Sequence, residues 1–168
     1  MIFLGLDPGT ATTGYGVVET QGMRRLHLAH GAIRTPYGLP PGERLKMIHE
    51  ALVGLFRRWR PDVVAMEELF FSSNVTTAIA VAQAQGVILL TAAQAGLRLL
   101  EFPPHRVKQT VTQDGRASKR DVQHMIMRLL ALSDVPQPDD AADALAIALC
   151  ATQETQWNAP LARSQAGR

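Results

Sequence analysis

The chain has 168 residues, of which 46% are hydrophobic and 19% are charged. This composition is ordinary for a globular protein and suggests one domain able to bury a core. The formal net charge is only +2, which excludes a uniformly basic surface, so a face for an acidic partner must come from local clustering. The single cysteine, Cys150, excludes an internal disulfide. With no secretory signal at the N-terminus, we expect a reducing, cytoplasmic setting.

The start of the chain predicts a three-stranded antiparallel meander. An apolar run over residues 2–6 ends on Asp7, just before a Pro-Gly turn. Further strand patterns cover residues 14–19 and 26–35, the later one interrupted by Gly31. Asp7 is therefore expected at the carboxyl end of a central strand, where open sheets bind their ligands. The alternative is that an Asp before Pro-Gly only makes a turn.

The next segment predicts a helix and then a parallel strand. Apolar residues recur at three- and four-residue spacing over 43–60, and Pro61 stops the helix. Residues 62–66 form a short apolar strand that ends on Glu67. The order strand, helix, strand implies a parallel crossover. In that arrangement Glu67 lies next to the strand that carries Asp7.

Residues 69–97 contain no charged residue. Their length would allow a membrane span, but Ser72, Ser73 and Asn74 interrupt the start and Gln and Thr recur throughout, so we predict no span. We predict instead a helix over 74–95 that is buried on most sides. For so small a protein this favours a second subunit covering part of the helix. The alternative is a central helix packed wholly within one chain.

The C-terminal third alternates short elements with polar loops. A strand is predicted over 98–102, a short helix over 105–111 and a loop over 112–117. Ser118, with Asp121 three residues later, has the pattern of a capping box at the start of a helix.

The last helix is predicted over residues 140–153, after a Pro-rich linker at 133–139. Residues 158–168 have little to bury, and we expect them to form a disordered tail. Residues 1–157 then make up the folded domain.

Four carboxylates are candidates for one metal site. Asp140 and Asp143 share one face of the last helix at its start, and Asp7 and Glu67 end adjacent strands. Acidic residues at a helix start are also ordinary capping chemistry, and Asp139 competes for the first place; we assign Asp139 as the cap and Asp140 as the ligand. Four carboxylates together repel unless cations lie among them. Oxygen ligands without a Cys or His cluster favour Mg²⁺ or Mn²⁺, and two such ions suit attack of water on a phosphodiester.

Five short motifs occur in order between residue 2 and about residue 151. They read Leu-Gly-Leu-Asp-Pro-Gly, Gly-Tyr-Gly, Ala-Met-Glu-Glu-Leu-Phe, Arg-Val-Lys-Gln-Thr-Val and Asp-Ala-Ala-Asp-Ala-Leu-Ala. Together they resemble the RuvC Holliday-junction resolvases. The resemblance implies an α/β, ribonuclease H-like fold: a mixed sheet, with an antiparallel three-stranded meander plus parallel strands, and helices on both faces. It also implies a homodimer that uses divalent metal.

The resemblance also implies roles for single residues. The positions that match the four catalytic carboxylates are Asp7, Glu67, Asp140 and Asp143. Phe70 matches an aromatic that wedges into the junction centre, and Lys108 and Lys119 match basic residues near the scissile phosphate. We place Lys119 in the catalytic set, as the group that stabilises the attacked phosphate.

The implied function is resolution of four-way DNA junctions in recombination and repair. The family makes paired nicks in strands of like polarity, which leave 5′-phosphate and 3′-hydroxyl ends. The resemblance further implies a branch-migration complex of the RuvA and RuvB type as partner.

Residues 98–128 carry seven basic and three acidic side chains, a local charge of +4. This segment is a candidate DNA face, because phosphate contacts dominate affinity for nucleic acids; a solvated helix flank is the alternative. Lys119 begins a helix, where a phosphate meets both an ammonium and free backbone amides. Phe70 is expected to stack on an unpaired base, worth roughly 1–3 kcal/mol, and the alternative is a core position. The predicted DNA-binding residues are Phe70, Lys108, Arg116, Lys119 and Arg120.

Two positions depart from the family's usual pattern. Gln85 stands where the relatives usually carry Arg, so this departure affects any contact made by the charge of that arginine. Gln113 stands where they usually have Gly, which concerns the path of the loop before Lys119. Neither departure touches the carboxylates.

Three rival functions belong to other classes. A YqgF-type nuclease shares the fold, but the basic segment and Phe70 argue against it. A junction-binding module that does not cut is distinguished by a cleavage assay. An actin-like ATPase or sugar kinase needs two such domains, and this chain is too short for them.

Overall fold

The computed structural model describes the backbone of residues 1–68 and 75–165 and the side chains of residues 1–68 and 78–155. Its centre is a five-stranded sheet in the order β3-β2-β1-β4-β5. The strands are β1 (Ile2–Asp7), β2 (Thr12–Gln21), β3 (Arg24–Arg34), β4 (Val63–Glu67) and β5 (Arg98–Phe102). β1, β2 and β3 pair antiparallel, and β4 and β5 add in parallel. The predicted meander and parallel crossover are confirmed.

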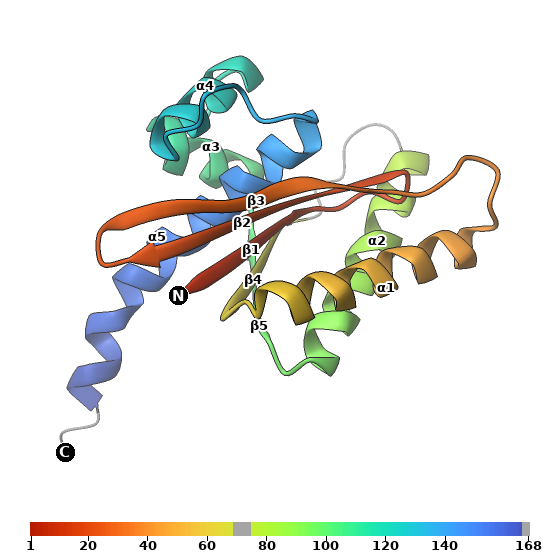
Figure 1. Ribbon diagram of the computed structural model, residues 1–168, viewed down its shortest axis with the longest axis horizontal. Coiled ribbons are helices and arrows are strands. Elements are labelled where there is room, and N and C mark those ends of the chain that lie inside the picture. Colours follow the sequence, from red (N-terminus) through yellow and green to blue (C-terminus); the bar gives the residue numbers. More distant parts are fainter. Residues whose placement is uncertain (69–74, 166–168) are drawn as a thin grey trace.

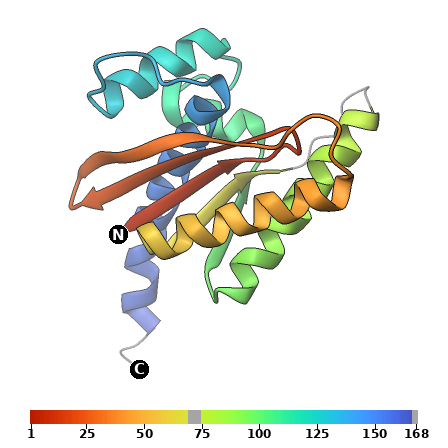
Figure 2. The ribbon, with the colours of Figure 1, turned by 45° about the vertical axis from the view of Figure 1, so that its right-hand side comes forward.

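Helices cover both faces of this sheet (Figures 1 and 2). The helices α1 (Pro41–Trp59) and α2 (Val75–Gln94) lie on one face, and α5 (Asp139–Gln165) crosses the other, with α3 (Pro104–Thr112) and α4 (Lys119–Leu129) beside it. Strand alternation divides the apolar residues between two cores. Leu4 and Leu6 of β1 pack against the α1 and α2 side, and Phe3 packs against the α5 side.

Three strand glycines let α5 lie directly on the sheet. A Cβ at Gly14 would collide with the backbone of Asp140, and one at Gly5 would collide with the backbone of Ala144. A Cβ at Gly16 would come within 2.7 Å of the Leu145 amide nitrogen. Glycine in a strand interior marks such a close backbone approach. The helix facing them is equally small, since Ala141, Ala142, Ala144, Ala146 and Ala148 are all buried.

Two predictions about local structure are wrong. Gly31 does not interrupt its strand: β3 runs through it, and the ring of Tyr15 on β2 leaves no room for a Cβ at this position. Asp139 is not the cap of the last helix but its first helical residue. The first backbone hydrogen bond at this end runs from the amide of Ala141 to the carbonyl of Pro138.

The last helix is also longer than predicted. It continues to Gln165, so the backbone of residues 158–165 is helical where a disordered tail was expected. Ala, Leu, Arg and Gln in this stretch favour a helix, whereas Pro160 can donate no hydrogen bond to it. Residues 166–168 lie outside the described part of the chain, and the division into a domain at 1–157 and a tail stays a prediction.

Other local predictions are confirmed. Ser118 and Asp121 form a capping box at the start of α4, each side chain bonding the other's backbone amide. Gln113 ends α3 in the left-handed region with φ 64°, a conformation that glycine adopts without strain. None of the helices within residues 1–68 and 75–165 combines the length and apolar character that a bilayer crossing requires.

We predict that Gly5→Ala lowers the free energy of unfolding by about 3 kcal/mol, because the new methyl group must push α5 off the sheet. The same change at Gly54, inside α1 with nothing within 4 Å of an added Cβ, should raise stability by about 0.5–1 kcal/mol. Urea unfolding at one protein concentration measures both. Equal stability of Gly5→Ala and the wild type would contradict the direct contact.

Candidate functional site

Two of the predicted carboxylates end neighbouring strands and point to the same face of the sheet. Asp7 is the last residue of β1 and Glu67 the last of β4, and the register of these parallel strands sets them level, one step beyond the Leu6 and Met66 pair. Both lie two residues after positions that face α5, Gly5 and Ala65. Strand alternation therefore turns both carboxylates toward α5.

The first turns of α5 bring the other two carboxylates to the same place. Gly14 pairs with Asp7 across β1 and β2, and the backbone of Asp140 passes directly over Gly14. Asp143 lies three residues further along this helix. The helix that rests on the strand glycines thus carries its acidic start to the end of the central strands.

A cavity of about 210 Å³ opens among these groups. Three of the acidic residues, Asp7, Glu67 and Asp143, line it together with Lys108 and Lys119. The remaining wall is mostly apolar and comes from α3, α4 and α5 through Pro104, Val107, Val122, Ala146 and Ile147. Asp140 does not line the cavity, but its charge acts on Asp7 and Asp143.

The carboxylates are crowded and repel one another. Burial raises the pKa of Asp7 to about 7, with further contributions from the charges of Asp143, Glu67 and Asp140. Burial also raises the pKa of Glu67, and the charge of Asp143 adds to the effect. For Asp143, burial raises the pKa while Lys119 opposes it. The site therefore has a deficit of positive charge.

Lys119 supplies part of that charge. Its Nζ lies 3.0 Å from Oδ2 of Asp143 and 3.4 Å from Oδ2 of Asp139. Burial by itself would lower the pKa of Lys119, but the hydrogen bond and charge of Asp143, followed by Asp139, outweigh it and raise the pKa. Asp139 in turn accepts from Nε2 of Gln123 at 3.0 Å, so the acid that was predicted to be the cap instead helps to hold the lysine.

The donor chemistry of the site fits divalent cations. The candidate ligands are all carboxylate oxygens, which Mg²⁺ and Mn²⁺ prefer, and the raised pKa of Asp7 marks a place where added positive charge is favourable. As the side chains stand, no group of three His, Cys, Asp or Glu within the described residues is close enough to share one ion. The candidate ligands would have to move closer together around a cation, and Asp143 would release Lys119 in order to bind that cation.

The other predicted DNA-binding residues are more scattered. Lys108 lines the cavity. Arg116 and Arg120 are exposed and do not line it. Phe70 lies outside the described residues. Arg106, from the same basic segment, forms an ion pair with Glu154 of α5.

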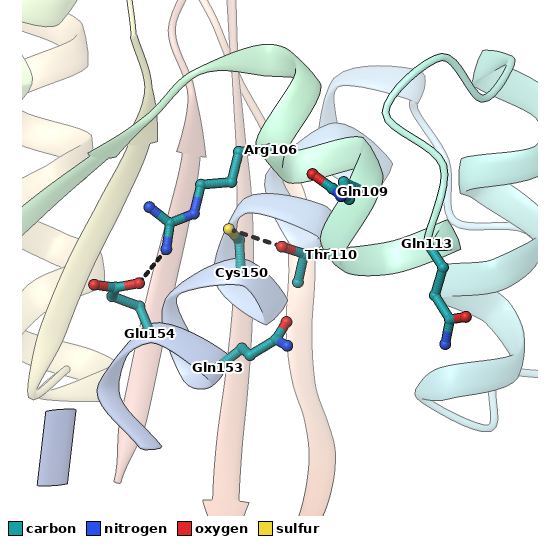
Figure 3. A pocket seen from close by; sticks show the side chains of 7 residues that line it. All are labelled: Arg106, Gln109, Thr110, Gln113, Cys150, Gln153 and Glu154. Carbon is teal, nitrogen blue, oxygen red and sulfur yellow. Dashed lines mark hydrogen bonds and ion pairs between the residues drawn. The ribbon is translucent and has the colours of Figure 1, made fainter. Parts of the chain in front are cut away.

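A second, larger hollow of about 510 Å³ lies between α3 and α5 (Figure 3). Its lining is mainly neutral and polar: Gln109, Gln113 and Gln153 contribute amides, and Thr110 Oγ1 lies 3.4 Å from the sulfur of Cys150. Cys150 is buried, and burial raises the pKa of its thiol. Glu154 is the one acid among the described residues that line this hollow, so the smaller cavity is the candidate metal site.

Sequence reasoning named Gln85 as a departure from the family pattern but missed its contact with the site. Gln85 of α2 is buried and its Nε2 donates to the main-chain carbonyl of Glu67 at 2.8 Å. The signal available was a glutamine in a helix predicted to be buried, where a polar side chain needs a partner.

Comparison with known proteins identifies the family. The family model described as crossover junction endodeoxyribonuclease RuvC matches residues 3–151. The chain belongs to the RuvC family. It is 52% identical to the RuvC of Heliobacterium modesticaldum over 157 residues, covering 94% of this chain and 97% of that protein. It is 53% identical to the RuvC of Rubrobacter xylanophilus over 149 residues, covering 89% and 83%.

Solved structures agree with this assignment. The structure titled T. thermophilus RuvC in complex with Holliday junction substrate has a TM-score of 0.89 and 34% identity, covering 94% of this chain and 96% of that one. The yeast mitochondrial resolvase Ydc2, at 15% identity and a TM-score of 0.65, shares the fold. The predicted family, α/β fold class and endonuclease class are confirmed.

We predict that Asp7 makes the chain less stable as pH rises when a chelator is present. Its folded pKa, about 7, lies above the ordinary 3.8, so between these values the folded state binds more protons than the unfolded state. The free energy of unfolding should therefore fall from pH 4 to pH 7, by on the order of 3 kcal/mol. In Asp7→Asn this loss should shrink. Urea unfolding in EDTA measures it, and Asp134→Asn, an exposed control, should keep the wild-type slope; an unchanged slope in Asp7→Asn would contradict the crowding.

Proposed function

We propose that this protein resolves four-way DNA junctions by paired, metal-dependent nicks in strands of like polarity. The observation that carries the proposal is the cavity lined by Asp7, Glu67 and Asp143 together with two lysines, with the charge of Asp140 acting on Asp7, in a chain of the RuvC family. A relative with 34% identity is described in complex with a Holliday junction substrate. The products would carry 5′-phosphate and 3′-hydroxyl ends.

The four carboxylates would hold two Mg²⁺ ions, with Mn²⁺ as the alternative. When bound, such ions supply activation of the attacking water and stabilisation of the leaving oxygen. The protein's own part is to gather the ligands: Asp7 and Glu67 are fixed by the sheet, and Asp140 and Asp143 by the first turns of α5. The apolar wall around Val107, Val122 and Ile147 would limit the water that reaches the site and strengthen its electrostatic interactions.

The lysines would bind the phosphate. Lys119 is within reach of Asp143, and once that carboxylate serves a cation, the ammonium is available to the attacked phosphate. Lys119 also opens α4, whose first backbone amides favour an anion. Lys108 approaches the same cavity from α3, so positive charge would flank the phosphate on two sides.

Further DNA contacts are proposed away from the cavity. Phe70 follows Glu67 closely in the chain and would stack on an unpaired base at the junction centre. Arg116 and Arg120 would bind phosphates of the arms. A branch-migration complex of the RuvA and RuvB type would deliver the junction, in the cytoplasm.

We further propose that the protein works as a homodimer through α2. One side of this helix packs on the sheet through Ala84, Ile88 and Ala92, but Ile79 and Leu90 are each 56% exposed. An uncharged helix with large apolar side chains in solvent is typical of a protein interface. Two-fold symmetry would then present two catalytic sites to a junction that is itself two-fold symmetric.

Two rival functions make different predictions. A junction-binding module that does not cut would have no use for the crowded carboxylates. A YqgF-type nuclease shares the fold but would not need Phe70 and the basic segment for selective binding of four-way DNA.

We predict that Asp7→Asn abolishes junction cutting and leaves junction binding intact, because it removes a metal ligand and no DNA anchor. A synthetic mobile four-way junction with Mg²⁺ measures cutting, and a gel shift in Ca²⁺ measures binding. Asp134→Asn should cut as the wild type does. Cutting by Asp7→Asn at the wild-type rate would refute the proposed site, and equal loss of binding would refute the assigned role.

We predict that Leu90→Glu converts the dimer to a monomer, because burying an unpaired charge at the interface is strongly unfavourable. Sedimentation equilibrium measures the change. The control is Met23→Glu at the tip of the β2–β3 hairpin, where the side chain is 88% exposed, and this variant should stay dimeric. A dimeric Leu90→Glu protein would place the interface elsewhere.

A further inference from the structure

The side chain of Gln85 bridges α2 and the end of β4. It is only 7% exposed and lies next to Ala84 and near Ile88, both fully buried. Its Nε2 donates to the carbonyl oxygen of Glu67 at 2.8 Å. A buried amide in such surroundings is retained only with a partner, and here the partner is the main chain of a proposed metal ligand.

The carbonyl of Glu67 needs this donor because the sheet cannot provide one. The amide of Glu68 donates to Phe102 of β5, and the carbonyl and amide of one trans peptide point in opposite directions. The Glu67 carbonyl therefore points toward β1. There the chain passes from Asp7 to Pro8, and proline has no N–H to donate.

The position of this bond gives it a functional consequence. β4 ends at Glu67, and in the part of the chain that the structure describes its continuation is held to the sheet by the bond from the Glu68 amide to Phe102. The Glu67 side chain faces α5 and the cavity, while Gln85 acts from the opposite side of the sheet. Gln85 thus fixes the peptide from which the carboxylate extends without touching the reacting groups.

We propose that Gln85 is a positioning residue for Glu67: it holds the last peptide of β4 so that the carboxylate is directed at the cation site. The proposal rests on the metal-dependent function proposed above. It also gives a use to the position where the family usually has Arg, since an arginine can donate to the same carbonyl. Partners that orient a metal ligand typically contribute about 10–100-fold in metal affinity or activity.

The test compares Gln85→Met, which keeps the length and removes the donor, with Gln85→Arg, which keeps a donor. Gln94→Met, the same change at an exposed position of α2, is the matched control. Two quantities are measured on the full chain: binding of Mn²⁺ without DNA, from the electron paramagnetic resonance signal of the free ion, and the Mg²⁺ concentration that gives half-maximal junction cutting.

The expected result is about 10-fold weaker Mn²⁺ binding and a matching rise in required Mg²⁺ for Gln85→Met, with affinity for the junction in Ca²⁺ unchanged. Gln85→Arg and Gln94→Met should respond as the wild type does. Wild-type metal binding by Gln85→Met would overturn the proposal. Equal loss in Gln85→Arg would also overturn it, because packing and not the donated hydrogen bond would then be responsible.

A second measurement avoids the risk that Gln85→Met does not fold. In wild-type protein, the side-chain amide resonance of Gln85 should shift on addition of Mg²⁺ while that of Gln94 stays in place. An unmoved Gln85 resonance overturns the proposal. The proposed function fails separately: if Asp7→Asn cuts normally, the metal site is wrong, whereas an inactive Asp7→Asn with a wild-type Gln85→Met refutes only the positioning role.

Discussion

The site depends on the close seat of α5 on the glycines of β1 and β2. Gly5, Gly14 and Gly16 have no side chains to hold the helix away, and the alanines of α5 fill the narrow space instead. Asp140 passes directly over the residue that pairs with Asp7. A helix held further out by ordinary side chains would carry its acidic start away from Asp7. Packing between small residues thus fixes the distance between the two halves of the site.

Gathering like charges opposes the stability of the fold. The pKa of Asp7 is raised to about 7 by burial and by its acidic neighbours, so the folded chain holds a strained electrostatic arrangement. Lys119 offsets part of this through Asp143 and Asp139. Its ammonium occupies the place of positive charge that a cation would otherwise supply. The positive charge of Lys119 therefore lowers the repulsion among the carboxylates, which helps the fold to remain stable before metal binds.

Much of the fold could be predicted because its signals are local. Apolar runs of strand length, helical spacing over 43–60 and the Ser118 and Asp121 pair each reflect interactions between residues close in the chain. The four candidate carboxylates could be singled out because each lies at the end of a recognisable strand or at the start of a recognisable helix. One prediction that failed involves a contact across the sheet: Gly31 lies within β3, where the ring of Tyr15 leaves no room for a Cβ, and no local pattern reveals that ring. The role of Gln85 depends on a carbonyl 18 residues away.

The sequence by itself therefore determined the family and the order of the elements and singled out the four acidic residues proposed as ligands, because motifs and periodicity are properties of the chain. Only the tertiary structure decided how these groups balance one another. It placed Asp139 against Lys119 and set Arg106 against Glu154. It also gave Glu67 a buried amide as support. Such pairings follow from the distances at which separate elements pack, and those distances depend on every side chain between them.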